Sequence, residues 1–337
     1  MKRPHYIKHW TDVEAPEQVR PPMMDEAFGY VGEFAPEANI SHLRIAHMRL
    51  PPGVRAYPPM ALRSLEIFAF VLEGTPDLWA DGHLYRLNEG DGICLASHTG
   101  IVHSVMNNSD SEVRFLSVTE PIALMGKAYH PTEPKAAESL KKMGAYWDDA
   151  PTRKRGPNSG KPGDVSGRKR GKPAFVAHWR TLLDDEPFKY PGSGEPHVVN
   201  ASFNRFARFA RIGVNVGVLK PGRRTSWPHA ERDEDEFMFV VSGKVDAWND
   251  GRIAPLRAGD FVGWEAATGI AHTVINNSDE DAVLIVGGEA SRQRAGIWYP
   301  FHPKRNKQVG DRYWADHPMR VFGLHDGLPD ALRKKKR

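Results

Sequence analysis

The chain has almost no cysteine and no long apolar run, and each absence narrows the class of protein. Cys94 is the only cysteine among 337 residues, so the chain cannot form an internal disulfide framework. No apolar segment follows the basic start of the sequence, which argues against a secretory signal. No apolar run reaches the roughly 18 residues that indicate a membrane-spanning helix. We therefore expect a cytoplasmic protein with no membrane partner.

The sequence also has little excess charge of one sign. Lys and Arg together number 46 against 42 Asp and Glu, which gives a formal net charge of +4. The basic residues concentrate in residues 153–172 and 333–337, where they could contact phosphates. Neither segment interleaves aromatic side chains with its charges, as sites for single-stranded nucleic acid do. We interpret the first segment as a mobile Gly/Pro-rich linker that trypsin cuts early and the second as a solubilising tail, so nucleic acid is the weaker alternative.

A repeat with an offset of 169 residues organises the whole sequence. Residues 53–110 align with 222–279 without a gap, and about 25 of those 58 positions are identical. Two tryptophan motifs outside this block recur at nearly the same offset: His9-Trp10 with His178-Trp179, and Trp147 with Trp314. The duplicated unit therefore covers nearly the whole chain. We expect an N-terminal domain over residues 1–150, a linker over 151–175 and a C-terminal domain over 176–337.

Both copies carry the signals of short β-strands joined by tight turns. Apolar or alternating runs predict strands at Leu43–Leu50, Ile67–Leu72, Ile212–Leu219 and Phe237–Val241. An Asp-Gly pair follows a tryptophan in each half, at residues 81–82 and 250–251, and Asp-Gly favours the type I′ turn of a hairpin. The best helix candidate is Ala136–Met143. These signals indicate two small all-β domains.

Imidazole and carboxylate side chains gather in the second copy. His229 and Glu231 would share one face of a strand because side chains alternate with period two. Glu236 follows on the adjoining segment, and His272 arrives from another strand. Neutral imidazole together with carboxylate suits a divalent metal of borderline or hard character. We expect a metal held by His229, Glu236 and His272, with Glu231 as a fourth ligand, a general base or an exposed side chain.

The spacing of these residues resembles the cupin family. Its motifs read G-x5-H-x-H-x3/4-E-x6-G and G-x5-P-x-G-x2-H-x3-N. Glu236-x6-Gly243 matches the end of the first motif, and Gly269-x2-His272-x3-Asn276 matches the end of the second. Glu231 stands where the first motif has its second histidine. The resemblance implies an all-β fold of two tandem cupin (jelly-roll, double-stranded β-helix) barrels with short helical or irregular extensions.

The first copy differs from the second at the expected ligand positions. At the offset of 169, His229, Glu231, Glu236 and His272 correspond to Met60, Leu62, Ile67 and His103. An aliphatic side chain offers no lone pair to a metal, and interior positions that have lost a metal should carry apolar side chains. We therefore expect a first barrel without metal, with His98 and His103 in structural roles.

A site of two histidines and one glutamate with open coordination positions resembles the facial triad of non-haem iron proteins. The cupin resemblance implies dioxygenases, isomerases and decarboxylases. We expect a metal-dependent protein with iron, manganese or zinc that acts on a small carboxylate or aromatic metabolite, with Glu231 as the candidate general base. The alternative is a bicupin that binds or senses a small molecule without turnover. A homodimer is left open.

Several side chains near the expected site have two interpretations. Arg205, Arg208 and Arg211 recur every three residues and are either exposed or a source of one bidentate anchor for a substrate carboxylate. Trp227 and Trp264 are close to ligand positions in the sequence and are either pocket walls or ordinary core. The C-terminal extensions that contain Trp147 and Trp314 are candidates to wrap the partner barrel.

Overall fold

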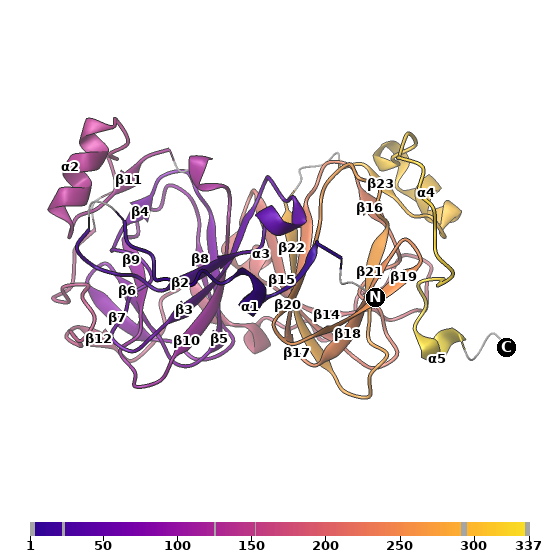
Figure 1. Cartoon of the computed structure of the whole chain (residues 1–337), viewed down its shortest axis with the longest axis horizontal. Helices are drawn as coiled ribbons and strands as arrows, with labels where there is room; N and C mark the ends of the chain where they lie inside the picture. The colour runs from indigo at the N-terminus through magenta and orange to yellow at the C-terminus, as the bar shows by residue number, and fades with distance from the viewer. Residues whose placement is uncertain (1–3, 22–23, 125, 152, 291–294, 334–337) are drawn as a thin grey trace.

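The computed structural model describes residues 4–21, 24–124, 126–151, 153–290 and 295–333. Two β-barrels lie side by side along its long axis, the first in purple and the second in orange (Figure 1). The two antiparallel barrels expected from the sequence are confirmed. No helix among these residues is long and apolar enough to cross a membrane.

Each barrel has one six-stranded sheet, and the two sheets have equivalent strand orders. In the first barrel the order is β13 (Val176–His178), β8 (Asp91–Leu95), β5 (Ile67–Glu73), β10 (Val113–Thr119), β3 (Arg44–Leu50) and β2 (Tyr30–Glu33). In the second barrel it is β1 (Ile7–His9), β20 (Asp260–Trp264), β17 (Glu236–Ser242), β22 (Ala282–Glu289), β15 (Ile212–Leu219) and β14 (Val199–Ser202). The strands predicted from the sequence fall at β3, β5, β15 and β17.

Shorter strands complete the barrels. The first has the sheet β12 (Arg168–Lys169), β7 (His83–Arg86), β6 (Asp77–Ala80) and β9 (His103–Met106), and the pair β4 (Ala61–Leu62) with β11 (Ala128–Tyr129). The second has β19 (Arg252–Arg257), β18 (Lys244–Asn249) and β21 (His272–Ile275), and the pair β16 (Ala230–Glu231) with β23 (Ile297–Trp298). Asp81, Gly82, Asp250 and Gly251 all have positive φ, so both Asp-Gly turns have the backbone that a type I′ turn requires.

Helices are few and short. The α-helices are α1 (Trp10–Val13), α2 (Pro134–Lys142), α3 (Phe203–Ala207), α4 (Pro303–Gln308) and α5 (Asp330–Arg333). Turns of 3-10 helix lie at Pro36–Ala38, Ile122–Leu124, Trp179–Thr181 and Gly310–Arg312. The helix expected at Ala136–Met143 is α2, which begins two residues earlier because proline is favoured in the first turn. Trp147 packs with Trp79 in the first barrel, so its segment covers its own barrel.

The alternation of β5 and β17 explains how the barrels pack together. In β5, Ala69 and Val71 face the interior of the first barrel, whereas Phe68 and Phe70 join a core that lies between the barrels. In β17, Phe237 and Phe239 join the same core. Each buried aromatic side chain contributes about 2–3 kcal/mol. The two barrels therefore share one continuous hydrophobic interface.

The N-terminal arms of the two copies are exchanged. Strand β1 pairs with β20 of the second barrel, and β13, which belongs to the second copy by sequence, pairs with β8 of the first. Figure 1 shows α1, which follows β1 directly, beside β20 of the second barrel. The His-Trp motifs continue this exchange: the amide of Trp10 donates to the carbonyl of Gly259, and that of Trp179 donates to the carbonyl of Gly90, both at 3.0 Å.

Glycine is required where the arms cross the barrels. A Cβ atom on Gly90 would lie 2.7 Å from Nε2 of His178, and one on Gly259 would lie 2.6 Å from Nε2 of His9. Both glycines also have positive φ, which other residues rarely adopt. Gly90 and Gly259 therefore allow the exchanged arms to pack closely against the barrels.

The basic segment at residues 153–172 packs against the first barrel and does not form the mobile linker that we expected. Arg168 and Lys172 pair with the buried carboxylates of Asp77 and Asp91 at 2.9 and 2.5 Å, and β12 adds a parallel strand beside β7. Arg55, which is 2% exposed, donates to the carbonyl oxygen of Gly160 at 2.8 Å. The segment therefore forms a strap that covers the first barrel and is held by backbone hydrogen bonds and ion pairs. We expected it to be mobile because it has few apolar residues, but these polar contacts do not require apolar residues.

The end of the second copy repeats this strap. Arg224 donates to the carbonyl oxygen of Gly327 at 2.8 Å, as Arg55 does to that of Gly160. Gly323 lies against Gly251 much as Gly156 lies against Gly82. Residues 153–172 are thus the C-terminal part of the first copy. Residues 334–337, the rest of the expected solubilising tail, lie outside the described residues.

Candidate metal centre

Three of the four expected ligands meet at one end of the second barrel. His229 lies just before β16 and His272 begins β21, and their backbones form an antiparallel bridge with reciprocal hydrogen bonds of 3.2 and 2.8 Å. Glu236 begins β17. Its Oε2 atom lies 3.0 Å from Nε2 of His272 and 3.7 Å from Nε2 of His229. One ligand atom from each of the three residues lies within 4.8 Å of the other two.

Both imidazoles are held in the orientation that a metal ligand needs. Nδ1 of His229 donates to the carbonyl oxygen of Trp227 at 2.9 Å, and Nδ1 of His272 donates to that of Ile270 at 3.1 Å. Because a carbonyl can only accept, the proton of the neutral ring is on Nδ1 and the lone pair is on Nε2. Such backbone partners commonly fix the ring of a ligating histidine. Both Nε2 atoms face Glu236 as a result.

Aromatic side chains fix the planes of these rings. Trp264 stacks on His272 with ring centroids 4.0 Å apart and planes 12° apart. Tyr299 lies against His229 at 5.8 Å. Trp264 is therefore a wall of the site, as one interpretation of the sequence held. Tyr299 was missed because it lies in the C-terminal extension, outside both motifs, where no spacing signal marks it.

Trp227 contributes to a neighbouring aromatic stack. Its ring lies between Tyr190 and His302 at centroid distances of 4.1 and 3.8 Å, and its Nε1 donates to Oε2 of Glu195 at 2.9 Å. Its carbonyl oxygen orients His229. The side chain of Trp227 thus packs in the aromatic stack beside the site, while its backbone carbonyl orients His229.

The ligand residues shift one another's pKa values. Burial lowers the pKa of His229, but the carboxylates of Glu236 and Glu231 outweigh it and raise the pKa to about 9. Burial raises the pKa of Glu236, but His272 and His229 outweigh it and hold that pKa well below its usual range. Without a metal, the cluster therefore keeps one carboxylate negative beside a cationic imidazole.

The donor set fits a divalent metal. Oε2 of Glu236 is buried and accepts no hydrogen bond of good geometry from the described residues, although two imidazoles lie close to it. Buried polar atoms normally have such partners. Two imidazole nitrogens and one carboxylate oxygen that surround a common point, with other positions open, match a site for iron, manganese or zinc.

Glu231 lies beside the three ligands but outside the group that they form. Its Oε2 atom is buried and has no hydrogen-bond partner among the described residues. Burial, and then the negative charge of Glu236, raises the pKa of Glu231 well above its usual range. The side chain is thus placed to hold a proton next to the site, and its role as a fourth ligand stays a prediction.

The equivalent residues of the first barrel have the same backbone geometry and different chemistry. Met60 and His103 form the same bridge that His229 and His272 form, and Nδ1 of His103 donates to the carbonyl oxygen of Ile101 at 3.2 Å. Met60, Leu62 and Ile67, however, surround His103 with apolar side chains. This position retains the orientation of a ligating histidine without the other expected ligands.

A second group of potential ligands, His42, Asp235 and Glu289, lies at the interface between the barrels. Oδ2 of Asp235 already accepts the backbone amides of Ser41 and His42, both at 3.0 Å. Glu66, at the equivalent position of the first barrel, accepts the amides of residues 210–212 in the same way. These reciprocal contacts are those that an approximate two-fold relation predicts. The group therefore joins the barrels.

The three arginines of the second copy do not anchor a substrate carboxylate at the metal ligands. Arg211 pairs with Glu120, the counterpart of Glu289, at the interface between the barrels. Arg205 pairs with Asp184 at 2.6 Å on the surface. Arg208 ends α3 in the left-handed conformation. The period of three in the sequence reflects this short helix and its end.

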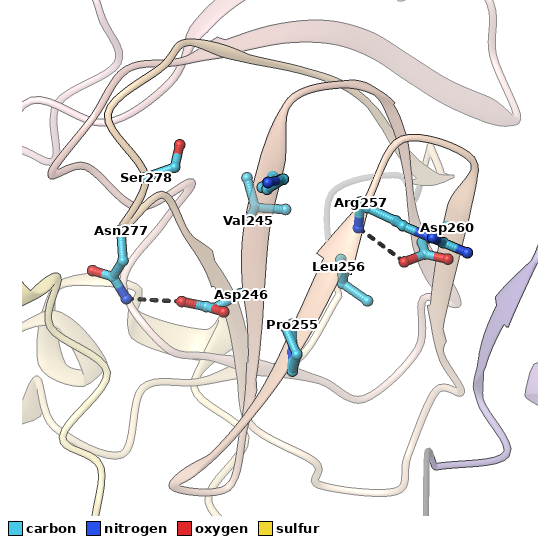
Figure 2. Close-up of a pocket in the computed structure, with 9 residues that line it drawn as sticks. Val245, Asp246, Pro255, Leu256, Arg257, Asp260, Asn277 and Ser278 are labelled. Carbon is cyan, nitrogen blue, oxygen red and sulfur yellow. Dashed lines mark hydrogen bonds between the residues drawn. The ribbon is translucent and has the colours of Figure 1, made fainter.

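A cavity of about 540 Å³ on the outer side of the second barrel is separate from the three ligands. It lies over β18 and β19, where Asn277 donates to Asp246 and the amide of Arg257 donates to Asp260 (Figure 2). In the first barrel the equivalent acidic residues, Asp77 and Asp91, are paired with the strap. The cavity is thus equivalent to the surface of the first barrel that the strap of residues 153–172 covers.

Comparison with known proteins agrees with this architecture. The sequence model of the Cupin domain family matches residues 46–119 and 215–287. No curated protein is significantly similar in sequence to the chain. Among solved structures, a mutant of Bacillus subtilis oxalate decarboxylase has a TM-score of 0.55 at 18% identity, over 88% of this chain and 80% of that one. A second mutant of that enzyme gives 0.53 at 19% identity, over 85% and 78%.

A further structure is described as addressing the Mn(II) centres of B. subtilis oxalate decarboxylase, with a TM-score of 0.54 at 18% identity, over 88% of this chain and 80% of that one. At such identities the likeness concerns the fold. It extends over both barrels and agrees with the two family matches, with the equivalent sheet orders and with the motif residues at His272 and Glu236. Each barrel thus contains a match to the Cupin domain model, and the chain has the two-barrel fold of a bicupin.

Proposed function

We propose that the second barrel binds one divalent metal ion through His229, Glu236 and His272 and acts on a small carboxylate substrate. The observation that carries this proposal is the convergence of three ligand atoms within 4.8 Å, with both Nε2 atoms directed at one carboxylate. The fold likeness to oxalate decarboxylase, a protein whose Mn(II) centres have been studied, supports a decarboxylase-like reaction over the other classes.

The residues of this chain have distinct tasks in such a reaction. A bound metal would supply a Lewis acid for a substrate carboxylate and for the negative charge that develops on it. His229 and His272 keep their lone pairs available because backbone carbonyls hold the opposite ring nitrogens. Trp264 limits the rotation of His272 by stacking on it. The site is therefore preorganised before substrate arrives.

Glu231 is the residue that we propose for proton transfer. When a carboxylate substrate loses carbon dioxide, the bond to the leaving carbon breaks and its electron pair stays on the remaining carbon, which then takes a proton. The Oε2 atom of Glu231 is buried and has no hydrogen-bond partner among the described residues, and its carboxyl is electrostatically coupled to Glu236 and His229. A general acid or base must lie within hydrogen-bond reach of the proton that it transfers, and we propose that a substrate bound at the ligands comes within that reach of Glu231.

Metal analysis of the purified protein tests the binding step. We expect about one iron, manganese or zinc ion per chain. His272→Ala and Glu236→Gln should remove most of it, because each leaves too few ligands. His103→Ala changes the equivalent histidine of the first barrel and is the matched control. Loss of metal in His103→Ala as complete as in His272→Ala would show that the ligands are assigned wrongly.

A substrate screen tests the reaction. The metal-loaded protein is incubated with small mono- and dicarboxylic acids, oxalate among them, while release of carbon dioxide and consumption of oxygen are measured in parallel. Carbon dioxide without matching oxygen uptake supports a decarboxylase, and stoichiometric uptake identifies a dioxygenase. Glu231→Gln should retain the metal and lose turnover. Bound metal without any turnover would favour the alternative, a binding or sensing protein.

A further inference from the structure

The first barrel contains a cavity of about 500 Å³. Most of its lining is apolar and includes Met48, Leu65, Ile67 and Phe115. Protein interiors are densely packed and contain few voids larger than a water molecule. A cavity of this size lies in the range of small-molecule sites. The aliphatic residues at the positions equivalent to the metal ligands therefore line the interior of the first barrel without filling it.

Three buried polar residues belong to this lining, His103, Ser117 and Thr119, and His103 is the only imidazole among them. His103 is 2% exposed and is part of the cavity wall. Its Nδ1 donates to the carbonyl oxygen of Ile101, so the lone pair is on Nε2. Burial lowers the pKa of His103 to about 4, which keeps the ring neutral at physiological pH. A neutral imidazole in this tautomer is a hydrogen-bond acceptor at Nε2, and it favours a ligand that donates a proton.

The other polar residues of the lining do not favour an anion. Arg44 is the only Lys or Arg among the described residues that line this cavity, and it is paired with Glu33. Tyr57 lies edge-on to His103 at 5.6 Å and adds an aromatic wall. A carboxylate ligand would therefore meet a neutral acceptor and a cation that is already neutralised. The chemistry selects an uncharged molecule.

Two large aliphatic side chains of the lining are exposed to solvent, beside the ion pair of Arg44 with Glu33. Val19 and Ile122 belong to the lining and are 40% and 53% exposed. Exposed large aliphatic side chains beside an open cavity offer an apolar ligand a contact surface at the entrance. Rim, lining and buried acceptor thus indicate one class of ligand.

We propose that the first barrel binds a neutral, largely apolar small molecule that carries a hydroxyl group, such as a phenol or an alicyclic alcohol, with its O–H donated to Nε2 of His103. This inference is independent of the function proposed for the second barrel. It assigns the first barrel a binding site whose preference is opposite to that of a metal centre that takes carboxylates.

Isothermal titration of the full-length, metal-loaded protein tests the proposal with three matched probes. 1-Naphthol offers a hydroxyl donor, 1-methoxynaphthalene has the same rings without the donor, and 1-naphthoate has a carboxylate. We expect 1-naphthol to bind with one site per chain and roughly tenfold more tightly than the methoxy compound, in keeping with one hydrogen bond in an apolar site. Tightest binding by 1-naphthoate would overturn the proposal.

Variants locate the site. His103→Leu should remove the preference for 1-naphthol and leave binding of 1-methoxynaphthalene within about twofold. Ala69→Leu, which narrows the cavity from β5, should weaken both probes; near-wild-type circular dichroism and metal content exclude misfolding. His272→Ala, the matched change in the second barrel, should leave 1-naphthol binding unchanged. An unchanged preference in His103→Leu, or loss of binding in His272→Ala, would refute the assignment.

Discussion

The two barrels share a backbone and differ in what they place at the same four positions. His103 and His272 sit in equivalent bridges, and each Nδ1 donates to the carbonyl oxygen two residues earlier. Around His272 the chain adds an imidazole and two carboxylates, whereas around His103 it adds aliphatic side chains. The difference shows that the cupin backbone orients a histidine by itself. The three neighbours then decide whether that histidine faces a metal or an apolar cavity.

The largest expected effect comes from giving the second barrel the residues of the first. The triple variant His229→Met, Glu231→Leu, Glu236→Ile should reduce bound metal from about one per chain to background, because one histidine remains. Its melting temperature should equal or exceed that of the metal-free wild type, since replacing buried charges with apolar side chains is often neutral or stabilising. Metal analysis and calorimetry check both points. Retained metal would break the comparison.

The next effect concerns the two C-terminal straps, which Arg55 holds in the first copy and Arg224 holds in the second. Arg55→Ala leaves the carboxylates of Glu26 and Glu133 without their buried partner and should cost about 3–5 kcal/mol of unfolding free energy. It should also expose residues 153–172 to trypsin, while the wild-type segment is cut slowly. Arg224→Ala should have the corresponding effect after Gly327. Timed proteolysis with mass spectrometry checks this. Equal cleavage of residues 153–172 in wild type and Arg55→Ala would show that the arginine does not hold the strap.

The pH dependence of stability should reveal the neutral histidine of the first barrel. The folded pKa of His103 is about 4 and the unfolded value is 6.5, so folding favours the neutral ring. Its contribution is fully present above pH 6.5 and is lost as pH falls towards 4. The loss is about 3 kcal/mol at most. Urea unfolding between pH 4 and 7 should show a shallower decline in His103→Leu. Parallel declines in the two proteins would contradict a buried neutral His103.

The smallest effect concerns the interface between the barrels. Arg211 pairs with Glu120 in one half, and at the equivalent position His42 lies 2.9 Å from Glu289 in the other. His42→Arg copies the first arrangement into the second. Because the His42 side chain is 53% exposed, the gain should be no more than about 1 kcal/mol. Thermal unfolding measures it, with Arg211→His as the reverse change. Destabilisation by His42→Arg would show that the two contacts are not equivalent.

The sequence alone determined the repeat, the main strands, both Asp-Gly hairpins and the residues that meet at the candidate metal centre. These follow from local rules: alternation along strands, turn chemistry and motif spacing. His229, Glu236 and His272 were predictable because the motifs fix where each lies along its strand, and strand alternation decides which side chains point inward.

Only the tertiary structure decided which barrel each arm joins and what the basic segment does. His9-Trp10 and His178-Trp179 have the same local sequence, so the sequence does not indicate which barrel edge each arm pairs with. The strap is held by contacts such as that of Arg55 with Gly160, which join residues 105 positions apart and leave no periodic signal. The cavity of the first barrel and the contact of Tyr299 with His229 likewise depend on how distant segments pack, which local patterns do not encode.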